Sequence, residues 1–139
     1  MSVLKNLFMK IVKKIRHIGI VTNNIKKSLW FYEKILGFKS KVKMIEYGKV
    51  TDKLTDINRA KIETLKLKSK NSEVMIELLQ FKNKKINGEK NYNISRIGTS
   101  HFAVTVNNLE KVYKKLKKLG MKFICKPLLS NDKKVKLTF

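Results

Sequence analysis

The sequence predicts an α+β fold in which one strand–helix–strand–strand–strand module occurs twice. The first copy opens with a short apolar segment, residues 16–21, followed by two asparagines and a helical pattern that ends at Leu36-Gly37. The same order of features returns 84 residues later and ends at Leu119-Gly120. His17 and His101, the two histidines of the chain, occupy equivalent places in the two copies. A repeat this long indicates an internal duplication rather than a solenoid.

The length and composition favour one globular domain. The chain has 139 residues, 42% of them hydrophobic, which is enough to bury a core. No apolar run approaches the roughly 20 residues that span a bilayer. A lone cysteine, Cys125, excludes an internal disulfide and predicts a reducing cytoplasm.

The net charge of +23 invites a polyanion-binding interpretation. However, only three of the 33 basic residues are arginines, and base readout and bidentate phosphate recognition favour arginine. The lysines are also spread along the whole chain, as a compositional bias would spread them. We therefore expect no specific nucleic-acid partner, and keep non-specific polyanion binding as a third hypothesis.

Residues 1–14 form a predicted N-terminal amphipathic extension with apolar residues three and four positions apart. It has no small-residue cleavage site, so it is not interpreted as a signal peptide. Two interpretations stay open: a helix that caps the domain or a partner subunit, and a basic surface anchor.

The first module, residues 15–81, begins with a strand over 15–21 in which His17 faces away from Ile18 and Ile20. Asn23 or Asn24 is the expected N-cap of the following helix, and Gly37 its stop. The apolar stripe of this helix is Ile25, Leu29, Tyr32 and Leu36.

The rest of the first module reads as three strands, over residues 38–46, 61–68 and 73–81. The intervening residues 48–60 are polar and irregular, which predicts a long loop over a pocket. Glu77 is unusual because it lies within the apolar run of the last strand. A carboxylate there must be exposed, paired with a nearby lysine, or bound to a cation.

Residues 82–96 are rich in lysine and asparagine and are the expected linker to the second module, residues 97–139. Its pattern predicts a strand over 97–106, a helix, a strand over 122–126 that Pro127 interrupts, and a strand starting at 134. The apolar stripe of its helix is Leu109, Val112, Tyr113, Leu116 and Leu119.

Three segments together resemble the vicinal oxygen chelate superfamily, the group of glyoxalases, bleomycin-resistance proteins and extradiol dioxygenases. The first is His17-Ile18-Gly19-Ile20-Val21 with the helix containing Trp30-Phe31-Tyr32 and the end Leu36-Gly37-Phe38; the second is Ile76-Glu77-Leu78-Leu79. The third is Ser100-His101-Phe102-Ala103-Val104 with Leu119-Gly120-Met121-Lys122-Phe123. The resemblance covers residues 15–139.

This resemblance implies two βαβββ modules whose curved mixed sheets surround a central cleft. It implies a divalent metal (Zn, Ni, Co, Mn or Fe) held by His17, Glu77 and His101, a donor set that suits first-row ions with open positions. It also implies an eighth strand with a second glutamate, the fourth ligand, which serves as a base in glyoxalase- and epimerase-like members. The sequence ends at Phe139, where that segment would begin. The second module is therefore expected to be incomplete, with a partner subunit or an additional water as the alternatives for the fourth ligand.

By the same resemblance we expect a glyoxalase-family lyase or isomerase, similar to lactoylglutathione lyases or epimerases. It would act on a small substrate with vicinal oxygens through a metal-stabilised enediolate. Glu77 is a candidate participant, and the proton-moving residue is not identified. The alternative is a metal-free or inactive binding protein of the same fold that sequesters drug-like ligands. Members of the superfamily commonly form dimers, so a homodimer is expected.

Overall fold

A computed structural model describes residues 12–83, 95 and 101–139, and the chain divides into two compact units, residues 1–89 and 90–139. The boundary falls inside the predicted linker 82–96, most of which lies outside the described residues. Residues 1–11 of the predicted N-terminal extension also lie outside them. Each unit is therefore described by itself.

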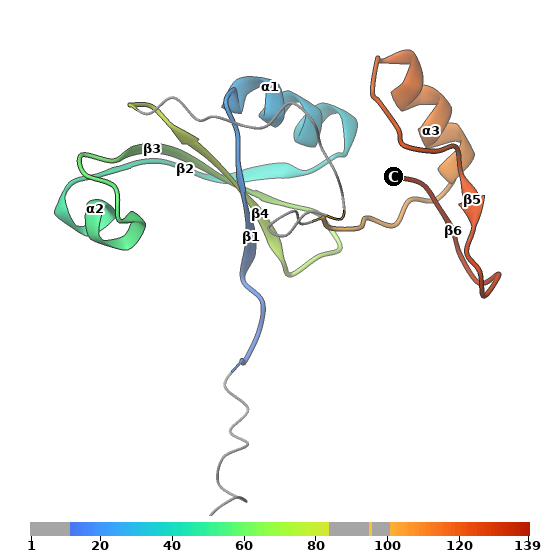
Figure 1. Cartoon of the computed structure of the whole chain (residues 1–139), viewed down its shortest axis with the longest axis horizontal. Helices are drawn as coiled ribbons and strands as arrows, with labels where there is room; N and C mark the ends of the chain where they lie inside the picture. The colour runs from blue at the N-terminus through green and yellow to red at the C-terminus, as the bar shows by residue number, and fades with distance from the viewer. Residues whose placement is uncertain (1–11, 84–94, 96–100) are drawn as a thin grey trace, which may run out of the picture. The chain divides into compact units, whose positions relative to one another are not determined.

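The first unit is a curved, mixed four-stranded sheet (Figure 1) with the strand order β1-β4-β3-β2. Its strands are β1 (His17–Val21), β2 (Lys39–Tyr47), β3 (Lys61–Lys68) and β4 (Met75–Phe81). β1 runs parallel to β4, whereas the β4–β3 and β3–β2 pairs are antiparallel. The first strand of the module is thereby placed next to the last.

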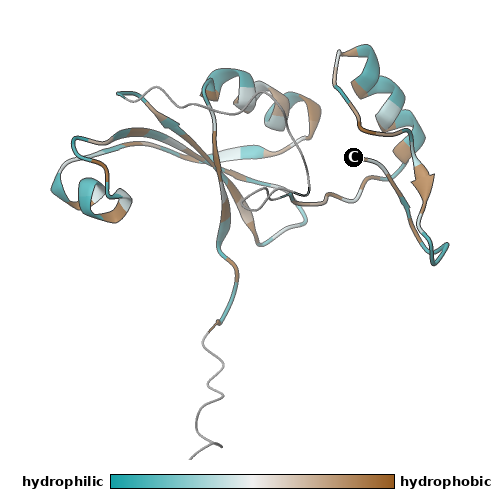
Figure 2. Cartoon of the chain, in the orientation of Figure 1, coloured by the Kyte–Doolittle hydropathy of each residue, from teal (hydrophilic) through white to brown (hydrophobic). Residues whose placement is uncertain are grey.

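One face of this sheet carries the apolar core together with α1 (Ile25–Trp30) and the π-helix η2 (Phe31–Ile35). Figure 2 shows hydrophobic and hydrophilic segments alternating along these helices, as amphipathic helices require. Core residues of the unit are almost inaccessible to solvent: Ile25, Phe38, Leu65, Leu67, Ile76 and Leu78. Burying them supplies the main stabilisation of the unit.

The sequence located the four strands of the first module within one or two residues, and the strand over 61–68 without any shift. The prediction of a loop over residues 48–60 is wrong in part, because α2 (Lys49–Thr55) forms there. None of its residues is buried, and its two apolar residues, Val50 and Leu54, are too few for the stripe by which a helix is recognised. Left-handed backbone at Asp56, with a φ of 53°, ends it.

The second unit contains α3 (Leu109–Lys118) and a small hairpin of β5 (Leu128–Leu129) and β6 (Lys136–Leu137). The duplication is visible at the helix starts. The Asn24 and Asn108 side chains each accept a 2.9 Å hydrogen bond from the backbone N–H three residues later. Gly37 and Gly120 follow the two helices with φ values of 76° and 82°. The N-cap and the helix stop predicted for the first module are confirmed, and the second helix has the corresponding cap and glycine.

Two predicted strands of the second module are wrong. Residues 101–106, the described part of the strand expected over 97–106, form no strand, and neither do residues 122–126. A strand exists only where a neighbour completes its hydrogen-bond ladder, and the part of this unit that is described has one ladder, between β5 and β6. Apolar alternation alone does not supply such a partner.

The predicted α+β fold class is confirmed by the mixed sheet and its covering helices. Among the described residues, no helix is long and apolar enough to cross a membrane.

Candidate functional site

The face of the first sheet opposite α1 carries polar side chains from all four strands. They are His17 on β1, Glu77 on β4, Lys66 and Thr64 on β3, and Glu46 on β2. These side chains contact one another across the strands. The Thr64 hydroxyl, which is fully buried, donates to the Glu46 carboxylate, and the other three form a separate cluster.

The strand register explains why His17 reaches Glu77. Gly19 lies directly opposite Glu77 in the parallel β1–β4 pair, and His17 is two residues earlier on the same face. His17 Nε2 lies 3.1 Å from Glu77 Oε2. His17 lies on the face opposite Ile18 and Ile20, as the alternation predicted. There it contacts Glu77, another residue of the predicted ligand set.

Lys66 is the third member of the cluster. It is paired directly with Glu77 in the antiparallel β3–β4 register, and its Nζ lies 3.1 Å from Glu77 Oε1. The side chains of Glu77 and Lys66 are 13% and 21% exposed, so this ion pair is largely removed from water. The interpretation that Glu77 pairs with a nearby lysine is confirmed.

Sequence analysis did not identify Lys66 as a site residue. The signal was present, because Lys66 shares a face with Ile62 and Thr64 in the alternating strand 61–68. What was missing was the register that sets it opposite Glu77.

The spacing of His17 and Glu77 suits a shared divalent ion. Two ligands about 2.1 Å from one metal and at right angles to each other are about 3.0 Å apart, close to the observed 3.1 Å. An imidazole nitrogen and a carboxylate oxygen are also ordinary donors for first-row metals. Lys66 is the unfavourable feature, because an ammonium group beside the carboxylate repels a second cation.

His101, the third predicted ligand, lies in the second unit. It is exposed, and its ring meets Phe139 edge-on with the centroids 5.2 Å apart. Among the residues described, no three His, Cys, Asp or Glu side chains are grouped to hold a metal ion. The assignment of all three residues to one centre stays a prediction.

Charged pairs outside the cluster shift the pKa values of other carboxyl groups. The hydrogen bond from Lys82, with smaller contributions from Lys43, holds the pKa of Glu63 below its ordinary value despite partial burial. In the second unit the contact with Lys136 does the same for the pKa of Glu110. Burial raises the pKa of the Tyr32 phenol on η2.

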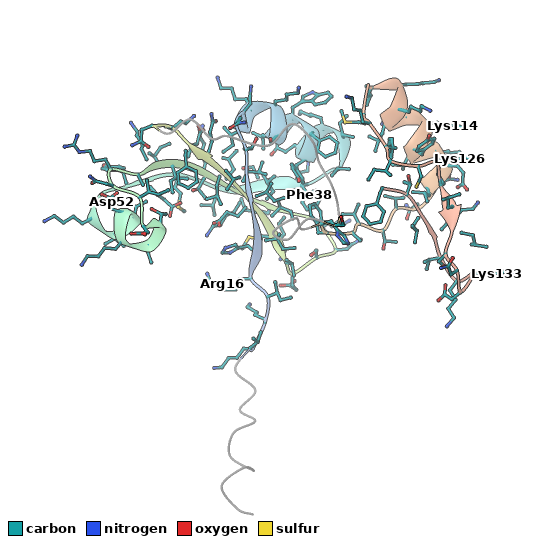
Figure 3. The ribbon with its side chains drawn as sticks, viewed as in Figure 1. Arg16, Phe38, Asp52, Lys114, Lys126 and Lys133 are labelled. Atoms are coloured by element: carbon teal, nitrogen blue, oxygen red, sulfur yellow. The ribbon has the colours of Figure 1, made fainter. Side chains whose placement is uncertain are left out.

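Residues 48–60 do border a pocket, as the sequence suggested. Its volume is about 950 Å³, and its lining includes Tyr47, Asp52, Arg59 and Lys61. Asp52, labelled in Figure 3, fixes one wall because its carboxylate accepts backbone hydrogen bonds from Arg59 and Ala60 at 2.9 and 2.8 Å. His17, Lys66 and Glu77 are not among the lining residues, so this pocket is separate from the cluster.

The sequence pattern of the Glyoxalase/Bleomycin resistance protein/Dioxygenase superfamily matches residues 14–127. This match covers most of the chain and includes all three residues of the proposed ligand set. The chain belongs to this superfamily, as the three motifs predicted. No curated protein matches it.

Solved structures support the same fold. A glyoxalase family protein from Bacillus cereus is 18% identical, with a TM-score of 0.74 over 85% of this chain and 80% of that one. The trypanothione-dependent glyoxalase I of Leishmania major is 16% identical, with a TM-score of 0.56 over 91% of this chain and 78% of that one. At these identities the likeness concerns the fold.

Proposed function

We propose that this protein is a metal-dependent lyase or isomerase of the glyoxalase type, acting on a small substrate with two adjacent oxygens. The observation that carries the proposal is the contact of His17 with Glu77, 3.1 Å apart on the face of the sheet opposite the helices. It joins two donors of the kind that first-row metals take, at a spacing that one ion can bridge. Membership of the superfamily supports the same assignment.

In this proposal His17 and Glu77 provide two ligands and His101 of the second unit provides the third. A bound divalent ion would supply Lewis-acid stabilisation of the negative charge that develops when the substrate loses a proton. Glu77, being largely buried, would hold its carboxylate in a fixed position for the ion. The protein would work as a homodimer in the reducing cytoplasm, which suits the free thiol of Cys125.

The test combines metal analysis with proton exchange. Purified protein is loaded with Zn²⁺, Ni²⁺, Co²⁺, Mn²⁺ or Fe²⁺, and bound metal is measured for the wild type and for the His17→Ala/His101→Ala double variant. Solvent-deuterium incorporation into 2-hydroxy ketones and hemithioacetals is then followed by NMR. We expect one metal per chain and exchange in the wild type only. Stoichiometric metal without exchange into any of these substrates would contradict the enzyme assignment.

A second candidate is a metal-free binding protein of the same fold that sequesters small ligands. The ion pair between Lys66 and Glu77 favours it, because the carboxylate is satisfied without any metal. The same double variant separates the candidates. A metal-free binder would keep its ligand affinity after both histidines are replaced, whereas the proposed metalloenzyme would lose metal and turnover together.

A further inference from the structure

We infer that Lys66 is a built-in competitor of the metal for Glu77 and that it sets how tightly this chain holds a divalent ion. The inference rests on the proposed function, and deepens it by assigning to one residue the control of metal loading. It follows from three features of the cluster: which atoms are engaged, how far they are from solvent, and which partners are within reach.

The Glu77 carboxylate makes two contacts in the cluster. Glu77 Oε2 faces His17 Nε2 and Glu77 Oε1 faces Lys66 Nζ, both at 3.1 Å. Both oxygens of the carboxylate are therefore engaged, one by the imidazole of His17 and the other by the ammonium group of Lys66. A divalent ion bound to Glu77 either shares the carboxylate with the ammonium group or displaces it.

Burial makes this competition costly. Only 21% of the Lys66 side chain and 13% of the Glu77 side chain are exposed, so water screens the pair weakly. In such surroundings, the repulsion between Lys66 and a dication at the same carboxylate is larger than it would be at the surface. Displacing Lys66 is unfavourable too, since an ammonium group without a counter-charge is then left in a partly apolar site.

Alternative partners for Lys66 are lacking in the part of the first unit that is described. Its one ion pair there is with Glu77. Glu46 on this face is occupied by the hydroxyl of Thr64, and Glu73 is paired with Lys68. Metal binding therefore requires the Lys66–Glu77 contact to be weakened or lost. The free-energy cost of that change lowers the apparent metal affinity.

Lys68 provides a matched control. It lies two residues further along β3 on the same face, but its carboxylate partner is Glu73, which is 87% exposed, at 3.5 Å. Lys66→Met and Lys68→Met remove the same charge from the same strand, and only the first removes it from Glu77. Lys66→Arg keeps the positive charge at the site and reports on charge apart from shape.

The experiment is calorimetric titration of Mn²⁺, and separately Ni²⁺, into metal-stripped wild type, Lys66→Met, Lys66→Arg and Lys68→Met. Thermal unfolding and circular dichroism of each variant establish that it is folded. We expect Lys66→Met to bind the metal about ten- to hundredfold more tightly than the wild type, because a positive charge beside the dication is removed from a weakly screened site. Lys66→Arg and Lys68→Met should stay within about twofold of the wild type.

The outcomes separate this inference from the proposed function. Measurable and equal affinities of wild type and Lys66→Met would overturn the role of Lys66 and leave the metal site intact. Absence of binding in both folded proteins would overturn the metal site itself, and the inference with it. Tight binding by Lys66→Met beside weaker but measurable binding by the wild type would support both, whereas binding by Lys66→Met alone would support the role of Lys66 and contradict the proposed function.

Discussion

The two faces of the first sheet are built on different principles. The face toward α1 and η2 carries most of the apolar core, with Leu67 and Leu78 fully buried, and one ion-paired carboxylate, Glu63. The opposite face buries polar groups instead, with Thr64 fully buried and Glu77 and Lys66 largely so. Successive residues of one strand therefore pack alternately against apolar side chains and against charged ones.

The two faces contribute differently to stability and to function. Apolar burial contributes free energy of folding wherever it occurs, whereas partly buried ion pairs add little net stability and are often replaceable by apolar residues. The contact of a histidine with the buried glutamate and lysine distinguishes the second face from Glu63 and its lysine partners on the first. We therefore interpret the apolar face as the scaffold and the polar face as the binding surface.

The largest effect is expected from truncating the scaffold. Leu78→Ala should lower the free energy of unfolding by about 3 kcal/mol, because it opens a cavity under the helices. Leu79→Ala, one residue along on the polar face, should lose about 1 kcal/mol, since Leu79 is only partly buried. Urea unfolding of both variants measures the two losses in free energy of unfolding. Equal losses would contradict the difference between the two faces.

The next effect concerns the polar cluster. Glu77→Leu leaves Lys66 without its partner and should lower the free energy of unfolding by about 2 kcal/mol. Adding Lys66→Met should restore most of that loss while metal binding stays abolished. A double-mutant cycle in urea, with metal titrations on the same proteins, gives both numbers. Strictly additive losses would show that the two residues do not interact, contrary to the account.

A smaller effect should depend on pH. The pKa of Glu63 is lowered in the folded protein, so its ion pairs stabilise the fold above the ordinary carboxyl pKa and cease to do so as the pH falls through the folded-state value. Glu63→Gln should therefore be less stable than the wild type by about 1 kcal/mol at neutral pH. In acid, below the lowered pKa, the two should converge. Unfolding curves across this range check the sign, and a gap that widens in acid would contradict it.

The smallest effect compares the two copies of the module. Asn24→Ala and Asn108→Ala each remove one side-chain cap from a helix start, which typically costs about 1 kcal/mol. Because the two hydrogen bonds have the same length, we expect similar losses, measured by thermal unfolding with Asn23→Ala and Asn107→Ala as the neighbouring controls. A loss at only one cap would mean that the copies no longer fold alike.

Local patterns predicted most of the first unit. The strand over 61–68 is a strict alternation, and Asn24 and Gly37 mark the start and end of the helix pattern, so both elements could be identified from sequence. The helix α2 could not, because Val50 and Leu54 are 72% and 81% exposed and no apolar stripe marks it. Asp52, which fixes the turn after it, is not distinctive in sequence.

The place of a single residue within a strand can be predicted from sequence, whereas the alignment of two strands cannot. His17 and Glu77 were selected from their places in apolar strands and from the family resemblance. The structure shows them in contact, and their assignment as metal ligands stays a prediction. Lys66 was missed, because its role depends on the β3–β4 register. Residues 101–106, the described part of the strand predicted over 97–106, form no strand, because strand pairing is a long-range property.

The measurement that tests the central claim most directly is an anomalous difference map from crystals grown with saturating Mn²⁺. The account predicts a manganese peak in contact with both His17 Nε2 and the Glu77 carboxylate, with His101 as a further ligand, and with Lys66 moved away from Glu77 Oε1. A map in which manganese binds elsewhere, or nowhere, while the contacts among His17, Glu77 and Lys66 stay at their present distances would contradict it.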